Sequence, residues 1–164
     1  MGLKLIFMLT TFFIIAVGTA DAEEKITIGG VEEVVLLPWG VKLPARIDTG
    51  AATSSLDARD LKVHDDMVEF KLPKRYGGLQ LRLPVVMWHD VRGAEFKGRR
   101  PAIEVTICIG SKTLRVHVTL NDRSTVEYPL IMGRNVLQNN FVVDVSRAKT
   151  TRPNCPDDKS RREY

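Results

Sequence analysis

The chain has 164 residues and a formal net charge of +4, with 44% hydrophobic and 27% charged residues. Six basic and three acidic residues lie from Arg147 onward, so most of the excess positive charge belongs to the C-terminal tail and the rest of the chain is close to neutral. The basic pI therefore does not indicate nucleic-acid binding, which needs a basic stripe on the folded domain, and this length suits a single domain with one hydrophobic core.

The first 22 residues have the pattern of a secretory signal peptide. Lys4 precedes an apolar run at 5–17, which is too short to span a bilayer, and small residues follow at 19–22. We therefore predict a signal peptide at 1–22, cleaved after Ala22, and a periplasmic or secreted protein with no stable membrane insertion after cleavage. The alternative is an N-terminal anchor that is not cleaved.

Short apolar runs rich in Val, Ile and Leu follow, separated by glycine-containing turns, which is a pattern typical of β-strands. Gly110 and Ser111 mark a tight hairpin turn. Helix is expected only as a short turn at 135–139, and 55–61 is ambiguous. We predict an all-β fold, a small closed barrel in one domain over 23–148. The predicted strands lie at 31–37, 41–47, 67–72, 79–88, 103–109, 114–120, 130–132 and 141–145.

The last part of the chain, 149–164, is polar, with two prolines and no apolar run. We predict that it is a disordered tail. The chain has two cysteines, Cys108 in an apolar run and Cys155 in the tail. In an oxidising compartment they can form one disulfide that holds the tail to the sheet. The alternative is a buried thiol at Cys108 and an exposed one at Cys155.

A single Asp-Thr-Gly motif, at 48–50, follows the apolar strand at 41–47, and a second apolar run ends at Gly133. Aspartic proteolysis needs two carboxylates that share one proton, so that one takes a proton from water while the other donates to the scissile carbonyl. Gly50 permits the sharp backbone turn after the aspartate, and Thr49 offers a hydroxyl that can link two facing loops. Because the motif occurs once, we predict that a second copy of the chain completes the pair in a homodimer.

The residues from Ile47 to Ala51, with Leu-Ile-Met-Gly-Arg-Asn at 130–135, resemble a retropepsin, the one-domain aspartic protease that works as a homodimer. Other segments, such as Leu-Asn-Asp-Arg-Ser at 120–124, are similar to a bacterial retropepsin-like family often labelled "ATP-dependent zinc protease", and the resemblance spans roughly 28–147. It implies a retropepsin-like (acid protease) barrel and an endopeptidase. The site residues that it implies are Asp48 as the catalytic acid and base, Thr49, Gly50 and Ala51 shaping the site, and Gly133 and Arg134 supporting it from beneath.

The chain departs from the viral retropepsins after the motif. Those enzymes carry two acidic residues there, one of which pairs with the arginine of Gly-Arg-Asn, whereas this chain has Ala52 and Thr53. Arg134 is therefore expected to find another partner, for which Asp57 is the candidate, or to face substrate. The viral dimer also uses an interleaved terminal sheet, and the polar C-terminus here leaves the geometry of the dimer interface open.

A retropepsin closes a glycine-tipped hairpin, the flap, over its substrate. We expect the flap at 89–98 with Gly93 as its hinge, and the competing candidate is 75–78. The expected substrate is a peptide or protein, and an acidic one would suit the basic residues near the site, since some members of the resembled family trim glutamate residues. The alternative is a solvated charged surface. The candidate substrate-binding residues are Arg46, Arg92, Gly93, Lys97, Arg99 and Arg100.

The label "ATP-dependent zinc protease" finds no support in the residues. The chain has no Gly-rich loop ending in Gly-Lys-Ser/Thr and no His-Glu-x-x-His motif, and His64, His89 and His117 are scattered singly. We therefore expect no metal site and no cofactor. The rival to the peptidase is a non-catalytic peptide-binding module that keeps the fold, and a weaker third candidate is a metal-dependent hydrolase.

Overall fold

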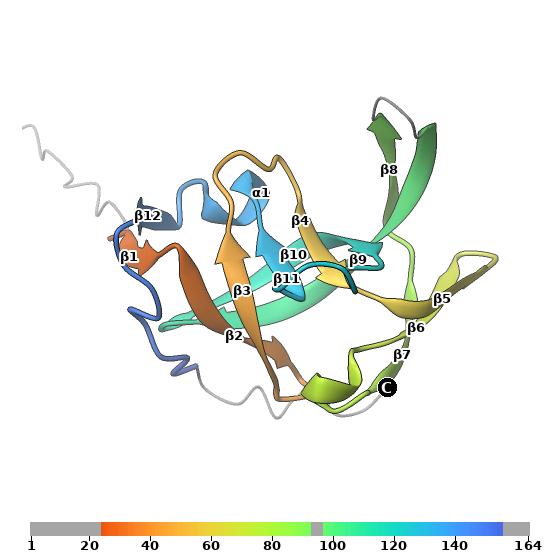
Figure 1. Cartoon of the computed structure of the whole chain (residues 1–164), viewed down its shortest axis with the longest axis horizontal. Coiled ribbons are helices and arrows are strands. Elements are labelled where there is room, and N and C mark those ends of the chain that lie inside the picture. Colours follow the sequence, from red (N-terminus) through yellow and green to blue (C-terminus); the bar gives the residue numbers. More distant parts are fainter. Residues whose placement is uncertain (1–23, 93–96, 156–164) are drawn as a thin grey trace, which may run out of the picture.

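The computed structural model describes residues 24–92 and 97–155 (Figure 1). Among these residues the fold is almost entirely β, as predicted, and helix is limited to the 3₁₀ turn η1 (Lys74–Tyr76) and the single turn α1 (Arg134–Leu137). The strands are β1 (Ile26–Gly29), β2 (Val31–Leu37), β3 (Val41–Ile47), β4 (Ser54–Asp57), β5 (Arg59–His64), β6 (Met67–Lys71), β7 (Gln80–Pro84), β8 (Met87–Arg92), β9 (Lys97–Ile109), β10 (Lys112–Asn121), β11 (Leu130–Met132) and β12 (Phe141–Asp144).

Six strands close into a barrel, which confirms the predicted architecture. They are hydrogen-bonded in the order β10-β4-β11-β3-β2-β9, and the hairpin pairing of β9 with β10 completes the ring. Strand β8 joins the outer edge of β9. Strand β11 runs parallel to β3, and β10 runs parallel to β4. The fully buried large side chains of the core are Ile28, Leu36, Leu43, Leu56, Phe70, Leu72, Ile103, Ile107, Ile109, Leu120, Leu130 and Met132.

Alternation along β2 explains how the strands bury one face. Val34 and Leu36 point into the core with 0% and 1% exposure, and the intervening Glu33 and Val35 are more exposed. Glu32 occupies an inward position as well and is 0% exposed. A buried carboxylate needs hydrogen-bond partners, and most of the partners of Glu32 come from Thr150 and Thr151.

The end of the domain lies beyond the predicted boundary at 148. The backbone N–H groups and hydroxyls of Thr150 and Thr151 donate to the Glu32 carboxylate, and the Gly29 N–H does so at 2.6 Å. Residues 149–155 are therefore an ordered strap, not part of a disordered tail, because the buried carboxylate captures them. Residues 156–164 lie outside the described part.

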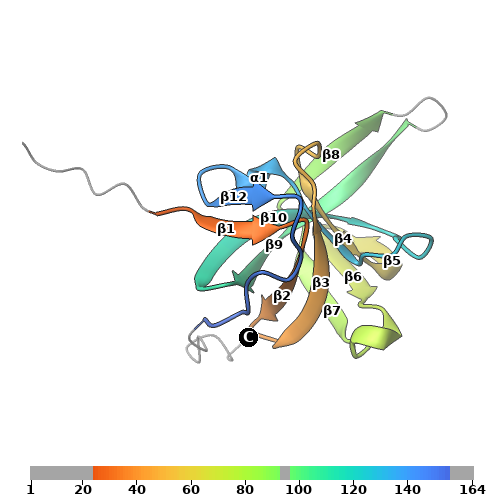
Figure 2. The ribbon, with the colours of Figure 1, turned by 60° about the vertical axis from the view of Figure 1, so that its left-hand side comes forward.

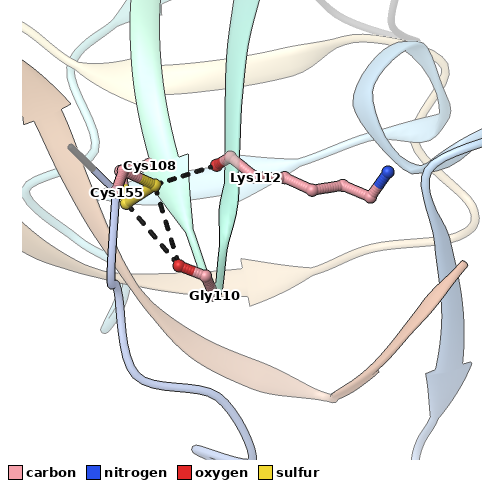
Figure 3. The surroundings of a disulfide bond; sticks show 4 residues. All are labelled: Cys108, Gly110, Lys112 and Cys155. Carbon is pink, nitrogen blue, oxygen red and sulfur yellow. Dashed lines mark hydrogen bonds between the residues drawn. A yellow bond between two sulfur atoms is a disulfide. The ribbon is translucent and has the colours of Figure 1, made fainter. Parts of the chain in front are cut away.

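A disulfide joins Cys108 of β9 to Cys155 at the end of this strap, with a Cα–Cα distance of 5.9 Å (Figure 3). Of the two states left open by the sequence, the structure thus has the cross-linked one. The Asn154 N–H also donates to the carbonyl of Gly110 at 2.7 Å. The disulfide and the Glu32 contacts hold the strap at two points.

Three segments differ from the sequence-based expectation. The ambiguous segment 55–61 is extended and belongs to β4 and β5. The single strand expected at 79–88 is two strands, because β7 pairs with β6 in a separate three-stranded sheet while β8 joins the barrel. Strand β1 was not predicted, because it is short and ends in the Gly29-Gly30 pair. It pairs in parallel with β12, and the two lie side by side in Figures 1 and 2.

The predicted signal peptide at 1–22 lies outside the described residues. Within 24–92 and 97–155, no helix has the length and apolar character needed to cross a bilayer.

Candidate active site

Asp48 is delivered to one end of the barrel by β3. This strand lies between β2 and β11, and its last residue, Ile47, donates its N–H to the Gly30 carbonyl at 3.0 Å. The Asp48 N–H then donates to the carbonyl of Met132, the last residue of β11, at 2.9 Å. Two neighbouring strands therefore fix the backbone that carries the carboxylate.

The Asp48 carboxylate is oriented by its own turn. Its Oδ1 atom accepts the N–H groups of Gly50 at 3.0 Å and Ala51 at 3.1 Å. The Gly50 N–H thus helps to hold the carboxylate in place. Within the described chain Oδ2 has no hydrogen-bond partner. Asp48 is half-buried, whereas Thr49 and Gly50 are exposed, so this loop presents one unpaired carboxylate oxygen at an accessible end of the barrel.

Arg134 clamps the same loop from α1. Its Nη1 atom donates to the carbonyl oxygens of Thr49 at 3.0 Å and Gly50 at 2.7 Å. Arg134 thus finds another partner, as expected, but that partner is not Asp57, and the expectation of a pair with Asp57 is wrong. The physical reason is that the chain after β11 passes directly against the loop, where the Arg134 N–H donates to the Ala51 carbonyl at 2.8 Å.

Gly133 makes this close approach possible. A Cβ at this position would lie 2.8 Å from the carbonyl carbon of Thr53 and 2.9 Å from the carbonyl oxygens of Ala51 and Thr53. Its N–H donates to the Ser54 hydroxyl at 3.0 Å, and that hydroxyl bonds in turn to Oδ1 of Asn135 at 2.9 Å. The segments on either side of the site are thus locked together without a side chain at 133.

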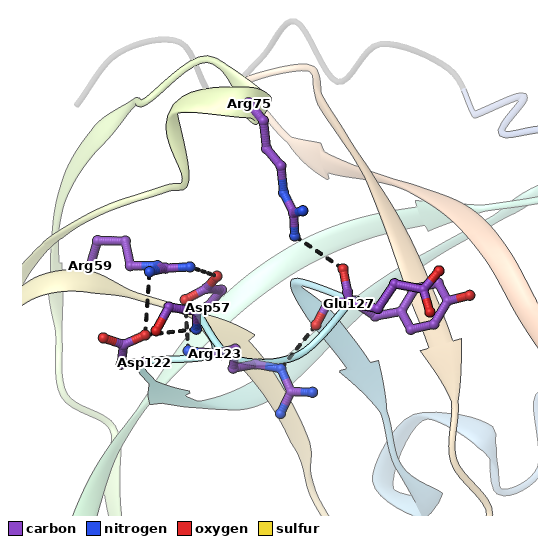
Figure 4. A network of polar contacts seen from close by, with 8 residues as sticks. Asp57, Arg59, Arg75, Asp122, Arg123 and Glu127 are labelled. Atoms are coloured by element: carbon purple, nitrogen blue, oxygen red, sulfur yellow. Dashed lines mark hydrogen bonds and ion pairs between the residues drawn. The ribbon is translucent and has the colours of Figure 1, made fainter.

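The Asp57 carboxylate, fully buried, organises a second network beside the site (Figure 4). Its Oδ2 accepts from Nη2 of Arg59 at 2.8 Å, and its Oδ1 accepts the Arg123 N–H at 2.9 Å. Arg59 also lies 3.4 Å from the Asp122 carboxylate. The hydrogen bond that Arg59 donates to Asp57 raises the pKa of Arg59. Asp57 therefore holds the loop that leads from β10 to β11.

Of the two flap candidates, the hairpin of β8 and β9 lies at the same end of the molecule as the Asp48 loop (Figures 1 and 2). His89 and Asp90 border a pocket that Ala51 and Thr53 of the Asp48 loop also line. The competing segment 75–78 begins within η1, at the opposite end. The proposed hinge, Gly93, lies outside the described residues, and Arg92 is the last residue of β8.

The other candidate arginines are placed differently. Arg100 lines the pocket beside the Asp48 loop, and Arg46 lies in register with Ile131, another residue of its lining. Arg99 instead pairs with Asp90 at 3.6 Å, and its guanidinium stacks over the Trp88 ring. The structure thus brings Arg100 to the site and Arg46 next to one of its lining residues, whereas Arg99 is engaged in an exposed pair on the hairpin.

The sequence analysis gave no role to three residues that line this pocket, Ser55, Thr119 and Arg123. Arg123 belongs to the Leu-Asn-Asp-Arg-Ser run at 120–124, which contributed to the family resemblance, but nothing in the run assigns it a role. Ser55 belongs to the Ser-Ser-Leu-Asp-Ala run at 54–58, which is similar to the same family, but nothing in that run assigns it a role either.

No group of three or more His, Cys, Asp or Glu side chains suited to a metal ion occurs among residues 24–92 and 97–155. His117 lies 3.6 Å from the Glu104 carboxylate. His89 contacts the Met87 sulfur at 3.1 Å.

The chain is similar to several known proteins. Two proteins named "Probable alpha-L-glutamate ligase", from Shewanella pealeana and Shewanella halifaxensis, are each 26% identical over 137 residues. The match covers 77% of this chain and 30% of either relative, so the chain spans less than a third of the length of these curated relatives. A crystal structure of a Legionella pneumophila protein of unknown function (DUF785) superposes with a TM-score of 0.69 at 26% identity, covering 79% of this chain and 100% of that one.

Residues 27–154 match the RimB-like family, described as "Retropepsin-like aspartic endopeptidase RimB". The matched region includes the Asp48 loop, the segment around Gly133 that packs against it, and the strap as far as Asn154. The chain therefore belongs to the RimB-like family of retropepsin-like aspartic endopeptidases.

Proposed function

We propose that this protein is an aspartic endopeptidase that hydrolyses peptide bonds with two Asp48 carboxylates, one from each chain of a homodimer. The observation that carries the proposal is the Asp48 loop. One carboxylate oxygen is held by two backbone N–H groups, and the other has no partner in the described chain. The exposed Thr49 and Gly50 leave room for a second copy to bring its own carboxylate to this point.

The proposed reaction follows from pairing the two carboxylates. Two carboxylates that lie close enough to share a proton cannot both be ionised, so the pair holds one proton. The ionised carboxylate takes a proton from a water whose oxygen attacks the peptide carbonyl carbon, and the protonated one gives its proton to the carbonyl oxygen. When the resulting diol collapses, a hydroxyl proton returns to the pair, the C–N bond breaks and the nitrogen takes a proton. The pair then again holds one proton.

We further propose that acidic peptides are the preferred substrates. Arg46 and Arg100 lie on the side of the barrel where substrate would approach Asp48. The glutamate in the name of the two Shewanella relatives belongs to those longer proteins, and it is compatible with an acidic substrate here. An alpha-L-glutamate ligase activity is not proposed, because this chain matches less than a third of their length.

We also propose that the protein acts outside the cytoplasm. The pattern of residues 1–22 supports export, and a disulfide such as Cys108–Cys155 is characteristic of proteins that fold in an oxidising compartment. Cell fractionation of the producing organism tests this proposal. Recovery of the protein from the cytoplasm with both thiols reduced would contradict it.

The direct test of the activity is peptide-library cleavage by the purified protein from acidic to neutral pH, beside the variants Asp48→Asn and Asp65→Asn. We expect Asp48→Asn to lose activity by several orders of magnitude, since each general acid or base role contributes roughly two to four decades. Asp65 is exposed in the turn between β5 and β6, so its variant should behave as wild type. Binding of peptides without cleavage by the wild type would favour the peptide-binding module instead.

A further inference from the structure

A pocket adjoins the Asp48 loop where the barrel meets the base of the β8–β9 hairpin. Ala51 and Thr53 bring it next to the catalytic carboxylate, so a substrate side chain in this pocket would neighbour the scissile bond. The residues that the argument uses are Ala51, Thr53, Ser55, Arg100 and Arg123.

The Ser55 hydroxyl is unsatisfied. Ser55 is only 8% exposed, and its Oγ atom has no hydrogen-bond partner in the described protein. The preceding Ser54 shows the contrast, because its hydroxyl bonds to both Asn135 and Gly133. Leaving a buried polar group unpaired costs roughly 1–3 kcal/mol, and a hydrogen bond to a group in the pocket that Ser55 lines would offset this cost.

Arg123 presents unused donors to the same pocket. Its backbone N–H is held by Asp57, and its Nε donates to the Tyr128 carbonyl at 3.1 Å (Figure 4). Its terminal amino groups have no acceptor among the described residues. Half-burial lowers the pKa of Arg123, Arg100 acts in the same direction, and the charges of Asp57 and Asp48 oppose the shift. An arginine in a protein nevertheless stays protonated, so a fixed, partly desolvated cation lies within the electrostatic reach of Asp48.

Arg100 adds a second cation whose guanidinium has no hydrogen-bond or ion-pair partner in the described chain. The neighbouring Arg99 is compensated by Asp90 at 3.6 Å. Asp90 also borders the pocket, but its charge is balanced by this pair. The positive charge that remains in the pocket therefore comes from Arg100 and Arg123.

We propose that Arg123 is a specificity-determining residue that binds a side-chain carboxylate of the substrate in this pocket, with the Ser55 hydroxyl and Arg100 as further donors. A planar guanidinium with two free terminal amino groups matches a carboxylate in a bidentate contact. The inference rests on the proposed peptidase function and adds the residues that recognise an acidic side chain beside the scissile bond.

The test compares an acidic peptide that the protein cleaves with counterparts in which one glutamate at a time is replaced by glutamine, a nearly isosteric change. For the residue in the pocket, we expect kcat/KM of the wild type to fall roughly 10- to 100-fold, the range of one charge-assisted hydrogen bond. Arg123→Gln should lose this discrimination, so that its kcat/KM values for the glutamate and glutamine peptides become similar, and Arg123→Lys should restore part of it.

Arg100→Gln is the second variant, because Arg100 has no partner among the described residues whose loss would affect folding. The matched control is Arg82→Gln, at an exposed residue of β7 that does not line the pocket. Arg100→Gln should weaken discrimination several-fold, and Arg82→Gln should leave it unchanged. Equal discrimination in wild type, Arg100→Gln and any folded Arg123→Gln would overturn the inference.

Calorimetric binding to Asp48→Asn separates this inference from the proposed activity. A short glutamate-rich peptide should bind more tightly than its glutamine counterpart, and Arg100→Gln in the same background should reduce the difference. If the wild type cleaves nothing but this pattern holds, the peptidase proposal fails and the subsite stands. If both peptides bind Asp48→Asn equally, the subsite fails.

Discussion

Replacing Gly133 with alanine tests whether the close approach beneath Asp48 controls both stability and activity. The new Cβ would lie 2.8–2.9 Å from backbone atoms of Ala51 and Thr53. These atoms cannot retreat independently, because the Ala51 carbonyl accepts the Arg134 N–H at 2.8 Å and the Gly133 N–H is bonded to Ser54. The loop that holds Asp48 must therefore shift by several tenths of an ångström.

The structure sets the size of the effect. Inserting a methyl group into a tightly packed site costs about 1–3 kcal/mol, and the small entropic gain of replacing glycine, about 0.4–1 kcal/mol, does not offset it. We expect Gly133→Ala to lower the free energy of unfolding by about 1–2 kcal/mol, which is the cost of the methyl group less the entropic gain. Peptide hydrolysis should fall at least tenfold in the fully folded variant.

Two other glycines provide matched controls. A Cβ at Gly29 would lie 2.5 Å from the Arg147 carbonyl oxygen, which is not part of the Asp48 loop, whereas one at Gly30 would meet nothing closer than 3.8 Å. Gly29→Ala should therefore lose stability but keep the wild-type kcat of its folded fraction, and Gly30→Ala should be neutral. Denaturant unfolding and peptide hydrolysis on all three variants decide the matter. A Gly133→Ala variant with wild-type stability and turnover would refute the reasoning.

Three further predictions concern other contacts. Arg134→Met removes two hydrogen bonds to the exposed Asp48 loop. We expect kcat to fall about tenfold or more, roughly the effect of losing one to two hydrogen bonds, while the melting temperature changes little. A parallel fall of kcat and melting temperature would contradict this. Burial tends to raise the pKa of Glu32, but hydrogen bonds from Thr150, Gly29 and Thr151 outweigh burial and lower it. Glu32→Gln should therefore destabilise the protein by roughly 1.5–3 kcal/mol at neutral pH. A carboxyl whose pKa is lowered by folding stabilises the fold at pH values above its pKa in the unfolded chain, so the difference between wild type and variant should shrink as the pH falls below about 4.5. A difference in unfolding free energy that stays constant with pH would contradict this. Hydrolysis should be unaffected by chelators or by ATP, and activity that returns only with added zinc would count against an aspartic mechanism.

Much of the fold could be predicted because each strand of the barrel carries its own pattern. The apolar runs that form β2, β3 and β11 were placed with their correct bounds. Strands β1 and β4 were missed because each has only four residues and pairs with strands distant in the sequence, as β4 does with β10 and β11. A local pattern does not carry that information. Strand β5 pairs with the neighbouring β6, and it was missed because only Leu61 and Val63 are apolar among its six residues.

The site was predictable only to the extent that one motif marks it. The Asp-Thr-Gly turn located Asp48, and the Gly-Arg run located the segment beneath it. The partner of Arg134 was mispredicted, because backbone carbonyls leave no trace in a sequence. Arg123 and Ser55 could not be assigned a role either, since burial and an unused hydrogen bond depend on how β4 and the loop before β11 pack.

The most direct test of the central claim, a catalytic pair shared between two chains, is subunit mixing. Wild-type protein at a fixed concentration is equilibrated with increasing amounts of Asp48→Asn, or of Asp65→Asn as a control, and the initial rate of peptide hydrolysis is measured. If each site needs one Asp48 from each chain, inactive mixed dimers form and the Asp48→Asn series loses activity progressively, whereas the Asp65→Asn series does not. The claim would be contradicted if excess Asp48→Asn left the wild-type activity unchanged while sedimentation showed that subunits exchange. It would also be contradicted if the activity were unchanged and sedimentation showed that the active protein is a monomer.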